Sequence, residues 1–283
     1  MTVSLAVTWL LAACTGGPAA GHPPASGTPA ATSPAPVPRS PAWLVTRAAL
    51  SQLIADSTVK ELLSGARLYE LLQPGQRPLP GIAADLVVVF PSAVALQRAV
   101  TGGQVPAGAY GVLYDPEAWS YTPAAEQRDP VAAAERAAAV AHAHGLRFFV
   151  APALNLTTVL APGGSSRWQS FLRLGLIGRL ARVADVVELQ AQSLERDTAT
   201  YRSFVSAAAA QASAAQPGVT VLAGLSTNPP GAPVTTEFLL SAIAATRSLV
   251  DGYWLNVPGQ GPRCPTCNAP RPDIAAQTLQ RLG

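Results

Sequence analysis

Two carboxylates and three aromatic side chains cluster in the middle of the chain, in the sequence GVLYDPEAWSY at residues 111–121. Pro116 has no N–H for a strand ladder and favours extended geometry in Asp115, so an apolar strand is expected to end here. Carboxyl groups that move protons or attack carbon suit sugar chemistry when aromatic faces hold the apolar side of a pyranose. The segment therefore predicts that Asp115 and Glu117 are catalytic acids. The predicted sugar-binding residues are Tyr114, Trp119 and Tyr121.

A structural interpretation of the same acids is also open. Carboxylates in turns commonly cap the next helix or accept hydrogen bonds from loop amides. Asp115 and Glu117 have the positions for either role.

Further polar residues stand at the ends of other expected strands. Glu188, Gln190 and Gln192 alternate along one strand, so they point the same way, and burying them is costly unless partners satisfy them. A polar barrel mouth accounts for all three, with Glu188 or Asp115 as the carboxylate that assists Glu117. An interior ion pair of Glu188 with an arginine is the alternative. The other predicted ligand-binding residues at strand ends are Gln190, Asn228, Trp254 and Asn256.

Apolar, β-rich runs alternate with Ala-rich helical stretches almost throughout the chain. The expected strands are 85–90, 110–114, 147–151, 185–189, 219–225 and 252–257, with weaker candidates at 67–72 and 43–45. The expected helices are 48–63, 93–100, 130–143, 168–182, 198–215, 235–249 and 272–282. Strands that are apolar on both faces are typical of parallel strands covered by helices. We expect an α/β fold, an eight-stranded TIM-type (β/α) barrel or a close variant, in a single domain at residues 42–283. A doubly wound open sheet is the alternative, but no glycine-rich phosphate loop follows a strand.

A barrel assigns different roles to its two ends, because activity lies where the strands end and stability where they begin. Asp85, Asp185 and Asp251 stand at strand beginnings and are expected to be structural. His142 and His144 end a helix just before a strand, which disfavours a Ser-His-Asp triad and a histidine-rich metal site. No metal or cofactor is expected.

The first residues carry an export signal. A short apolar run at 5–13 ends in Leu-Ala-Ala followed by Cys14, which resembles the lipobox of bacterial lipoprotein signal peptides. The resemblance implies a signal peptide at 1–14 and lipid acylation, such as palmitate, at Cys14. Residues 15–41 are rich in Pro, Ala, Gly, Ser and Thr and are expected to be a disordered tether. The protein is then expected at the outer face of the bacterial cytoplasmic membrane.

The two remaining cysteines lie close together, in the sequence CPTC at residues 264–267. In an oxidising compartment, a disulfide between Cys264 and Cys267 is expected. Their spacing also occurs in thioredoxin-type redox sites, but this pair lies in a Pro-rich loop near the carboxyl terminus rather than at the start of a helix. A zinc site would need a second pair of ligands.

The overall composition restricts the partners. The chain of 283 residues is 49% hydrophobic, 12% charged and has a formal charge of +3. Its arginines are scattered rather than gathered into a stripe with aromatics, so nucleic acid is not expected as a partner. The sequence contains no run of about 18 or more apolar residues, so it does not predict a membrane-spanning helix.

The strand ends resemble a known class of enzymes. The sequences Tyr-Asp-Pro-Glu at 114–117 and Tyr-Trp-Leu-Asn at 253–256 resemble the acid-bearing strand end and the last strand of glycoside-hydrolase barrels, loosely those of chitinase-like proteins. The chitinase pattern of spaced aspartates before the catalytic glutamate is present only as Asp115-x-Glu117. The resemblance implies a membrane-anchored glycosidase that acts on a cell-envelope or environmental polysaccharide. The alternative is a non-catalytic carbohydrate-binding or structural lipoprotein with a degenerate barrel.

Overall fold

Eight parallel strands close into a barrel in simple sequence order, β1 to β8. The computed structural model describes residues 40–229, 234–261 and 264–283; the predicted lipobox and nearly all of the predicted tether lie outside them. The strands are β1 (Ala42–Thr46), β2 (Leu68–Leu72), β3 (Asp85–Phe90), β4 (Gly111–Tyr114), β5 (Arg147–Val150), β6 (Val186–Leu189), β7 (Thr220–Ser226) and β8 (Gly252–Asn256). The predicted TIM-type barrel is therefore confirmed, including its two weaker strands, and the open sheet is excluded.

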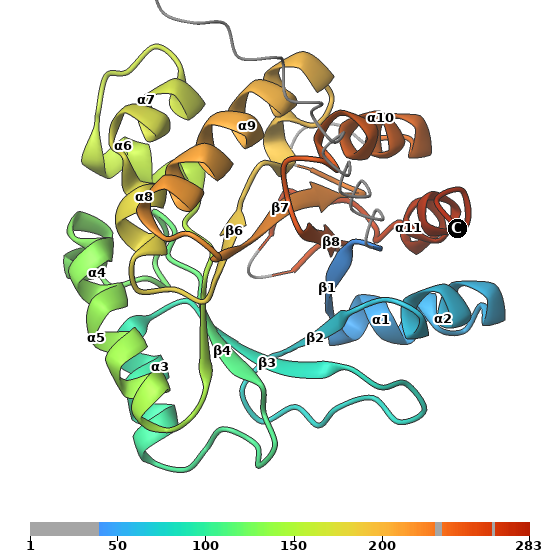
Figure 1. Ribbon diagram of the computed structural model, residues 1–283, viewed down its shortest axis with the longest axis horizontal. Helices are drawn as coiled ribbons and strands as arrows, with labels where there is room; N and C mark the ends of the chain where they lie inside the picture. The colour runs from blue at the N-terminus through green and yellow to red at the C-terminus, as the bar shows by residue number, and fades with distance from the viewer. Residues whose placement is uncertain (1–39, 230–233, 262–263) are drawn as a thin grey trace, which may run out of the picture. The chain divides into compact units, whose positions relative to one another are not determined.

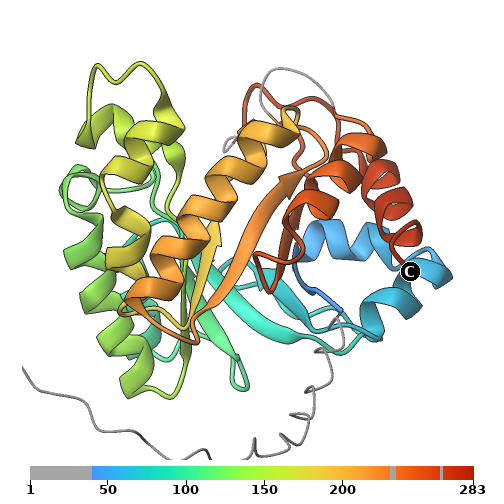
Figure 2. The same ribbon diagram turned by 45° about the horizontal axis from the view of Figure 1, so that its top comes forward.

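Helices surround the barrel on its outside (Figures 1 and 2). They are α1 (Arg47–Leu53), α2 (Ser57–Ser64), α3 (Ala93–Thr101), α4 (Ala124–Arg128), α5 (Pro130–Ala143), α6 (Thr157–Leu160), α7 (Arg167–Arg173), α8 (Leu176–Ala181), α9 (Thr198–Ala215), α10 (Thr236–Thr246) and α11 (Pro272–Gln280), with short 3₁₀ turns η1 (Leu154–Leu156) and η2 (Gln192–Leu194). None of the helices in these residues is both long and apolar enough to cross a bilayer.

Two predicted helices are each divided in two. The expected helix at 48–63 is interrupted because Asp56 accepts hydrogen bonds from the N–H groups of Thr58 and Val59 and so begins α2. The expected helix at 168–182 is interrupted at Gly175, whose φ of 59° is left-handed and ends α7.

The strands alternate between two apolar layers. Val87 and Val89 of β3 belong to the cluster inside the barrel, whereas Val88 and Phe90 belong to the cluster between the barrel and the helices. This alternation explains why the strands are apolar on both faces. Inward-pointing residues near the strand ends are consequently the ones that can reach a site at the barrel mouth.

The barrel closes where β8 pairs with β1. Gly252 pairs with Ala42 there, and a Cβ on Gly252 would lie 2.1 Å from the carbonyl oxygen of Ala42. Only glycine permits this close approach of the two strands.

The acids at the strand beginnings accept hydrogen bonds from backbone N–H groups of neighbouring strands and from basic side chains, as expected. Asp185 accepts hydrogen bonds from the Phe148 N–H at 2.8 Å, the Arg147 guanidinium at 2.6 Å and His142 Nε2 at 2.8 Å. Asp251 accepts from the N–H of Val221 at 2.8 Å. These acids lie at the end of the barrel opposite the predicted site.

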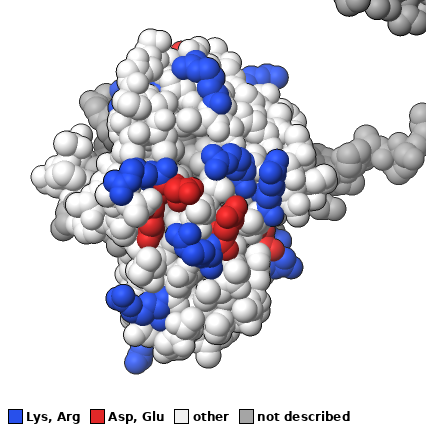
Figure 3. Space-filling view, turned by 90° about the vertical axis from the view of Figure 1, so that its left-hand side faces the viewer, with Lys and Arg blue, Asp and Glu red and all other residues white. Residues whose placement is uncertain are grey.

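Charges of both signs lie next to one another on the face at the left of Figure 1 (Figure 3). Positive side chains on that face are interspersed with acids rather than collected into a separate patch.

Candidate active site

A pocket of about 630 Å³ opens at the carboxyl ends of the strands. Its volume lies in the range of small-molecule sites. Its polar and aromatic lining comes from the carboxyl-terminal parts of β1 and β8 and from the segments that follow β1, β2, β4 and β6. These residues are Thr46, Arg47, Gln73, Gln76, Asp115, Glu117, Trp119, Tyr121, Gln190, Gln192, Trp254 and Asn256. The structure thus brings together most of the residues predicted from the sequence.

Asp115 directly follows β4 and is almost completely buried in the pocket wall. Its N–H donates to the carbonyl of Phe90, which extends the pairing of β4 with β3 by one residue. Gln190 donates from Nε2 to Asp115 Oδ1 at 2.6 Å and to the carbonyl of Ala151 at 2.8 Å. This pair of bonds fixes the Asp115 carboxylate relative to the ends of β5 and β6.

The loop that carries Glu117 is held by side-chain hydrogen bonds. Asn155 donates from Nδ2 to Glu117 Oε2 at 3.1 Å and accepts the N–H of Ala118 on its own Oδ1 at 2.9 Å. The Glu117 N–H donates to Thr122 Oγ1, and that hydroxyl donates to the carbonyl of Pro91. Glu117 is therefore presented to the pocket by a fixed loop, as a catalytic acid requires.

An aromatic wall stands beside the two acids. Trp119 and Tyr121 pack edge to face with ring centroids 5.0 Å apart, and Trp119 Nε1 donates to Thr122 Oγ1 at 2.9 Å. Tyr121 is 41% exposed, so its ring is accessible from solvent. Rings oriented in this way offer apolar faces for a sugar.

Trp254 extends the apolar surface to the inside of the barrel. Its side chain belongs to the inner cluster and also lines the pocket. Its Nε1 is buried and has no hydrogen-bond partner in the residues that the structure describes. Asn256 ends the same strand at the pocket, so β8 supplies both residues predicted from it.

Glu188 lies inside the barrel and does not line the pocket. It does stand on the predicted strand, and its side chain points into the barrel as predicted. Its side chain is fully buried, and neither carboxyl oxygen has a hydrogen-bond partner within the described chain. A Cβ on Gly224 would come 2.7 Å from Glu188 Oε1, so glycine at 224 makes room for this carboxyl group. Burial raises the pKa of Glu188 well above its usual range, and the negative charge of Asp115 adds to the increase.

Two predicted ligand-binding residues do not line the pocket. Tyr114 points outward from β4 into the layer under the helices, where its hydroxyl donates to Glu126 at 3.0 Å. The parity of β4 explains this, because Asp115 and Tyr114 are adjacent and must face opposite sides. Asn228 is buried, and its N–H donates to Ser226 Oγ.

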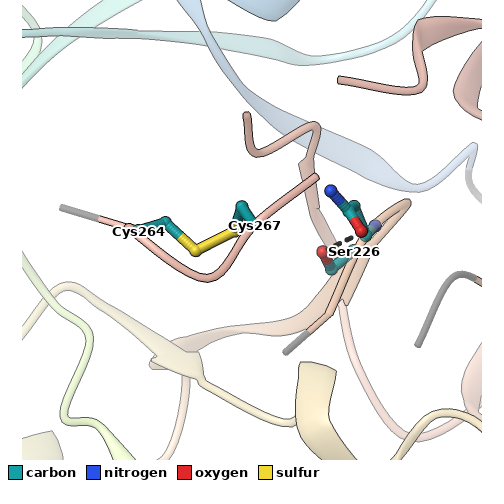
Figure 4. The surroundings of a disulfide bond; sticks show 4 residues. Ser226, Cys264 and Cys267 are labelled. Carbon is teal, nitrogen blue, oxygen red and sulfur yellow. Dashed lines mark hydrogen bonds between the residues drawn. A yellow bond between two sulfur atoms is a disulfide. The ribbon is translucent and has the colours of Figure 1, made fainter. Parts of the chain in front are cut away.

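The predicted disulfide between Cys264 and Cys267 is present in the structure (Figure 4). It belongs to the loop after β8, and Cys264 lines the pocket together with Pro258, Gly259 and Gly261. The crosslink therefore stabilises a part of the pocket wall.

Sequence reasoning missed several pocket residues. Arg47 directly follows β1 and Gln73 directly follows β2, the two strands with the weakest sequence signals, so no pattern marked these residues as belonging to a strand end. Gln76 lies in the loop after β2. Asn155 is in the turn after β5, and no local pattern marks it as a partner of Glu117.

The described residues contain no group of three or more His, Cys, Asp or Glu side chains with the geometry to hold a metal ion. The chemistry available at the pocket from these residues is that of two carboxylates, amides, a guanidinium and aromatic rings.

Comparisons with known proteins add information about the fold. No protein-family model matches the sequence, and neither does any curated protein. Among solved structures, a candidate alpha-L-fucosidase from Bacteroides thetaiotaomicron is 9% identical with a TM-score of 0.51, and the match covers 92% of this chain and 98% of that one. A family GH18 chitinase from the fern Peteris ryukyuensis is 19% identical with a TM-score of 0.42 and coverages of 80% and 78%. At 9% identity, the similarity to the candidate fucosidase shows the barrel fold alone.

Proposed function

We propose that the protein is a glycosidase that binds a polysaccharide in the barrel-mouth pocket and hydrolyses it with Glu117 and Asp115. The observation that carries the proposal is the shared pocket, which gathers these two carboxylates with the rings of Trp119, Tyr121 and Trp254. The barrel similarity to a candidate fucosidase and the resemblance of the strand ends to glycoside-hydrolase barrels support it.

In this mechanism Glu117 donates its proton to the glycosidic oxygen, and the bond from that oxygen to the anomeric carbon breaks. The carboxylate of Asp115, oriented by Gln190, stabilises the positive charge that develops on the sugar. Water then adds to the anomeric carbon and gives its proton to the carboxylate of Glu117, which restores the acid. Asp115 suits the second role better than Glu188, because Asp115 lines the pocket and Glu188 is buried beneath it.

The test is release of reducing sugar from a panel of polysaccharides that includes peptidoglycan and chitin. Glu117→Gln and Asp115→Asn should each lower turnover by about 10² to 10⁴-fold, because an amide keeps the shape but neither donates the proton nor carries the charge. Glu61→Gln, an exposed change on α2 outside the pocket, is the matched control and should keep wild-type turnover. Wild-type rates in the Glu117→Gln variant would contradict the assignment of the acid.

A non-catalytic carbohydrate-binding protein is the second candidate. It is favoured by one observation: both pocket carboxylates come from the end of β4, whereas glycosidases use acids that flank the scissile bond. Saturable binding of a glycan by the wild type, with no products after prolonged incubation, would establish this alternative.

We also propose that Cys14 is lipid-acylated and anchors the protein to the outer face of the bacterial cytoplasmic membrane, on the basis of the lipobox-like sequence that precedes it. Cys14→Ser should release the protein from carbonate-washed membranes, and retention of the variant would contradict the anchor.

A further inference from the structure

The pocket carries one cationic side chain among the lining residues that the structure describes. Arg47 begins α1 immediately after β1 and is the only Lys or Arg of that lining. Along the closed sheet, β1 lies three strands from β4, which carries the two acids. With neighbouring strands about 4.8 Å apart, this separation is about 14 Å around the barrel wall. Opposite charges thus line separate parts of one pocket.

Arg47 is held at its Nε. That nitrogen donates to the carbonyl of Arg77 at 2.5 Å and lies 4.0 Å from Glu70 Oε1. Glu70 is itself fixed, because its side chain is 1% exposed and both of its oxygens accept the N–H of Leu79, at 3.0 and 3.1 Å. The guanidinium is therefore oriented by the carbonyl of Arg77 and by the buried carboxylate of Glu70.

The outer edge of the same guanidinium remains available. Its two Nη groups have no hydrogen-bond or ion-pair partner in the described part of the chain, and the side chain is 33% exposed. A guanidinium that is anchored at Nε and presents its remaining donors is suited to a planar anion, above all a carboxylate.

Two amide side chains stand on the same wall. Gln76 accepts the N–H of Gln73 on Oε1 at 2.8 Å, and both glutamines line the pocket with Arg47. This hydrogen bond occupies the side-chain oxygen of Gln76, so its side-chain NH₂ group is the part that can donate to a ligand. Arg47 and Gln76 together form a donor-rich wall after β1 and β2.

An anionic ligand group has one favourable place in this pocket. Near the carboxylate of Asp115 it meets negative charge, whereas at Arg47 it meets the positive charge of the guanidinium. Because the two walls are separate, the anion at Arg47 and the group that contacts the acids belong to different parts of the ligand.

We propose that Arg47 binds the carboxylate of an acidic sugar and that the ligand is therefore an acidic polysaccharide. This inference rests on the proposed carbohydrate function and names the substrate class for the same pocket. The carboxylate can belong to a uronic acid or to the lactyl ether of a peptidoglycan strand from which the peptides have been removed, since both present the free carboxylate that Arg47 recognises.

The experiment is calorimetric titration of the full chain with three ligands of matched length. They are hyaluronan oligosaccharides, which carry uronates, peptide-free peptidoglycan glycan strands, which carry free lactyl carboxylates, and neutral chitin oligosaccharides. The wild type should bind at least one acidic ligand more tightly than the neutral one, and rising salt should weaken only the acidic interaction. The acidic ligand that binds more tightly identifies the source of the carboxylate.

Arg47→Gln should weaken binding of the preferred acidic ligand by about 10- to 100-fold and leave neutral binding unchanged. Arg47→Lys should retain part of the affinity, because it keeps the charge but loses the planar pair of donors. Arg281→Gln is the matched control, since Arg281 also bonds a carboxylate, that of Glu237, but on α11 outside the pocket.

The outcomes separate this inference from the proposed function. Equal affinity of the wild type for neutral and acidic ligands, or unchanged acidic binding by Arg47→Gln, overturns the role of Arg47 while the carbohydrate function stands. Binding of none of the three ligands by the wild type overturns both. The salt dependence of the wild type tests the inference even where Arg47→Gln does not fold.

Discussion

Replacement of Glu126 by glutamine should strongly destabilise the protein. Glu126 is a buried residue of α4, and its carboxylate connects β4, α4 and the beginning of α3. It accepts four hydrogen bonds, which come from Ser92 Oγ at 3.1 Å, the Ala93 N–H at 2.8 Å, the Val94 N–H at 3.2 Å and the Tyr114 hydroxyl at 3.0 Å. Two of these donors are N–H groups of the first turn of α3, which have no partner within the helix and favour negative charge.

The expected cost follows from the number of donors on each oxygen. Oε1 accepts from Ser92 and Val94, and Oε2 accepts from Ala93 and Tyr114. Glutamine keeps one acceptor oxygen, so its NH₂ group faces two donors and leaves them unsatisfied. At roughly 1.5–3 kcal/mol for each hydrogen bond to a charged group, Glu126→Gln should lower the free energy of unfolding by about 3–6 kcal/mol. Tyr114→Phe removes one donor and should cost about half as much or less.

Urea unfolding of the full chain, followed by circular dichroism, measures these differences. Glu61→Gln on the exposed side of α2 is the control and should change stability by less than about 0.5 kcal/mol. A loss below about 1 kcal/mol for Glu126→Gln would refute the reasoning. A marked loss of glycan affinity in stable Tyr114→Phe protein would show that Tyr114 serves the pocket after all.

Two further predictions concern acids away from the pocket surface. Burial opposes ionisation of Asp185, but hydrogen bonds from Phe148, Arg147 and His142 outweigh the effect of burial and lower the pKa of this carboxyl group. The contribution of Asp185 to stability is therefore present above about pH 4 and is lost as pH falls through the lowered pKa. Asp185→Asn should therefore cost about 1–3 kcal/mol at pH 7, with a smaller difference from the wild type in urea unfolding below pH 4 and with turnover preserved. Glu188 has a raised pKa, so the folded state keeps a proton that the unfolded state releases, and the contribution of Glu188 to stability should fall with rising pH above about pH 4, by at most about 1.4 kcal/mol per unit. Glu188→Gln should remove this dependence, and parallel stability curves of variant and wild type between pH 4.5 and 8 would contradict it.

Local sequence patterns determined most of the fold. Pro130 at the first position of α5 and Asp129, whose side chain accepts the Ala132 N–H, define a helix that begins where it was predicted. Strands with apolar residues on both faces, such as β3, indicate parallel pairing under helices. These signals are local, because caps and periodicity depend on neighbouring residues in the chain.

The sequence also determined which strand end carries the acids. Pro116 ends β4, and the parity of the chain directs Asp115 inward, so the presence of Asp115 in the pocket follows from local geometry. The same parity directs Tyr114 outward to Glu126, so the sequence around β4 also contains the reason why Tyr114 does not line the pocket.

Only the tertiary structure decided how deep each residue lies and which distant residues meet. The closed barrel places Glu188 below the pocket and Asp115 on the pocket wall. The stagger between neighbouring strands sets how deep each side chain lies in the barrel, and neither strand's own sequence specifies that stagger. Gln190 reaches Asp115, 75 residues earlier in the chain, and Asn155 reaches Glu117 only because β4, β5 and β6 end side by side. Arg47 shares the pocket with these acids for the same reason, since closure of the barrel brings the end of β1 to the same mouth as the ends of β4 and β8.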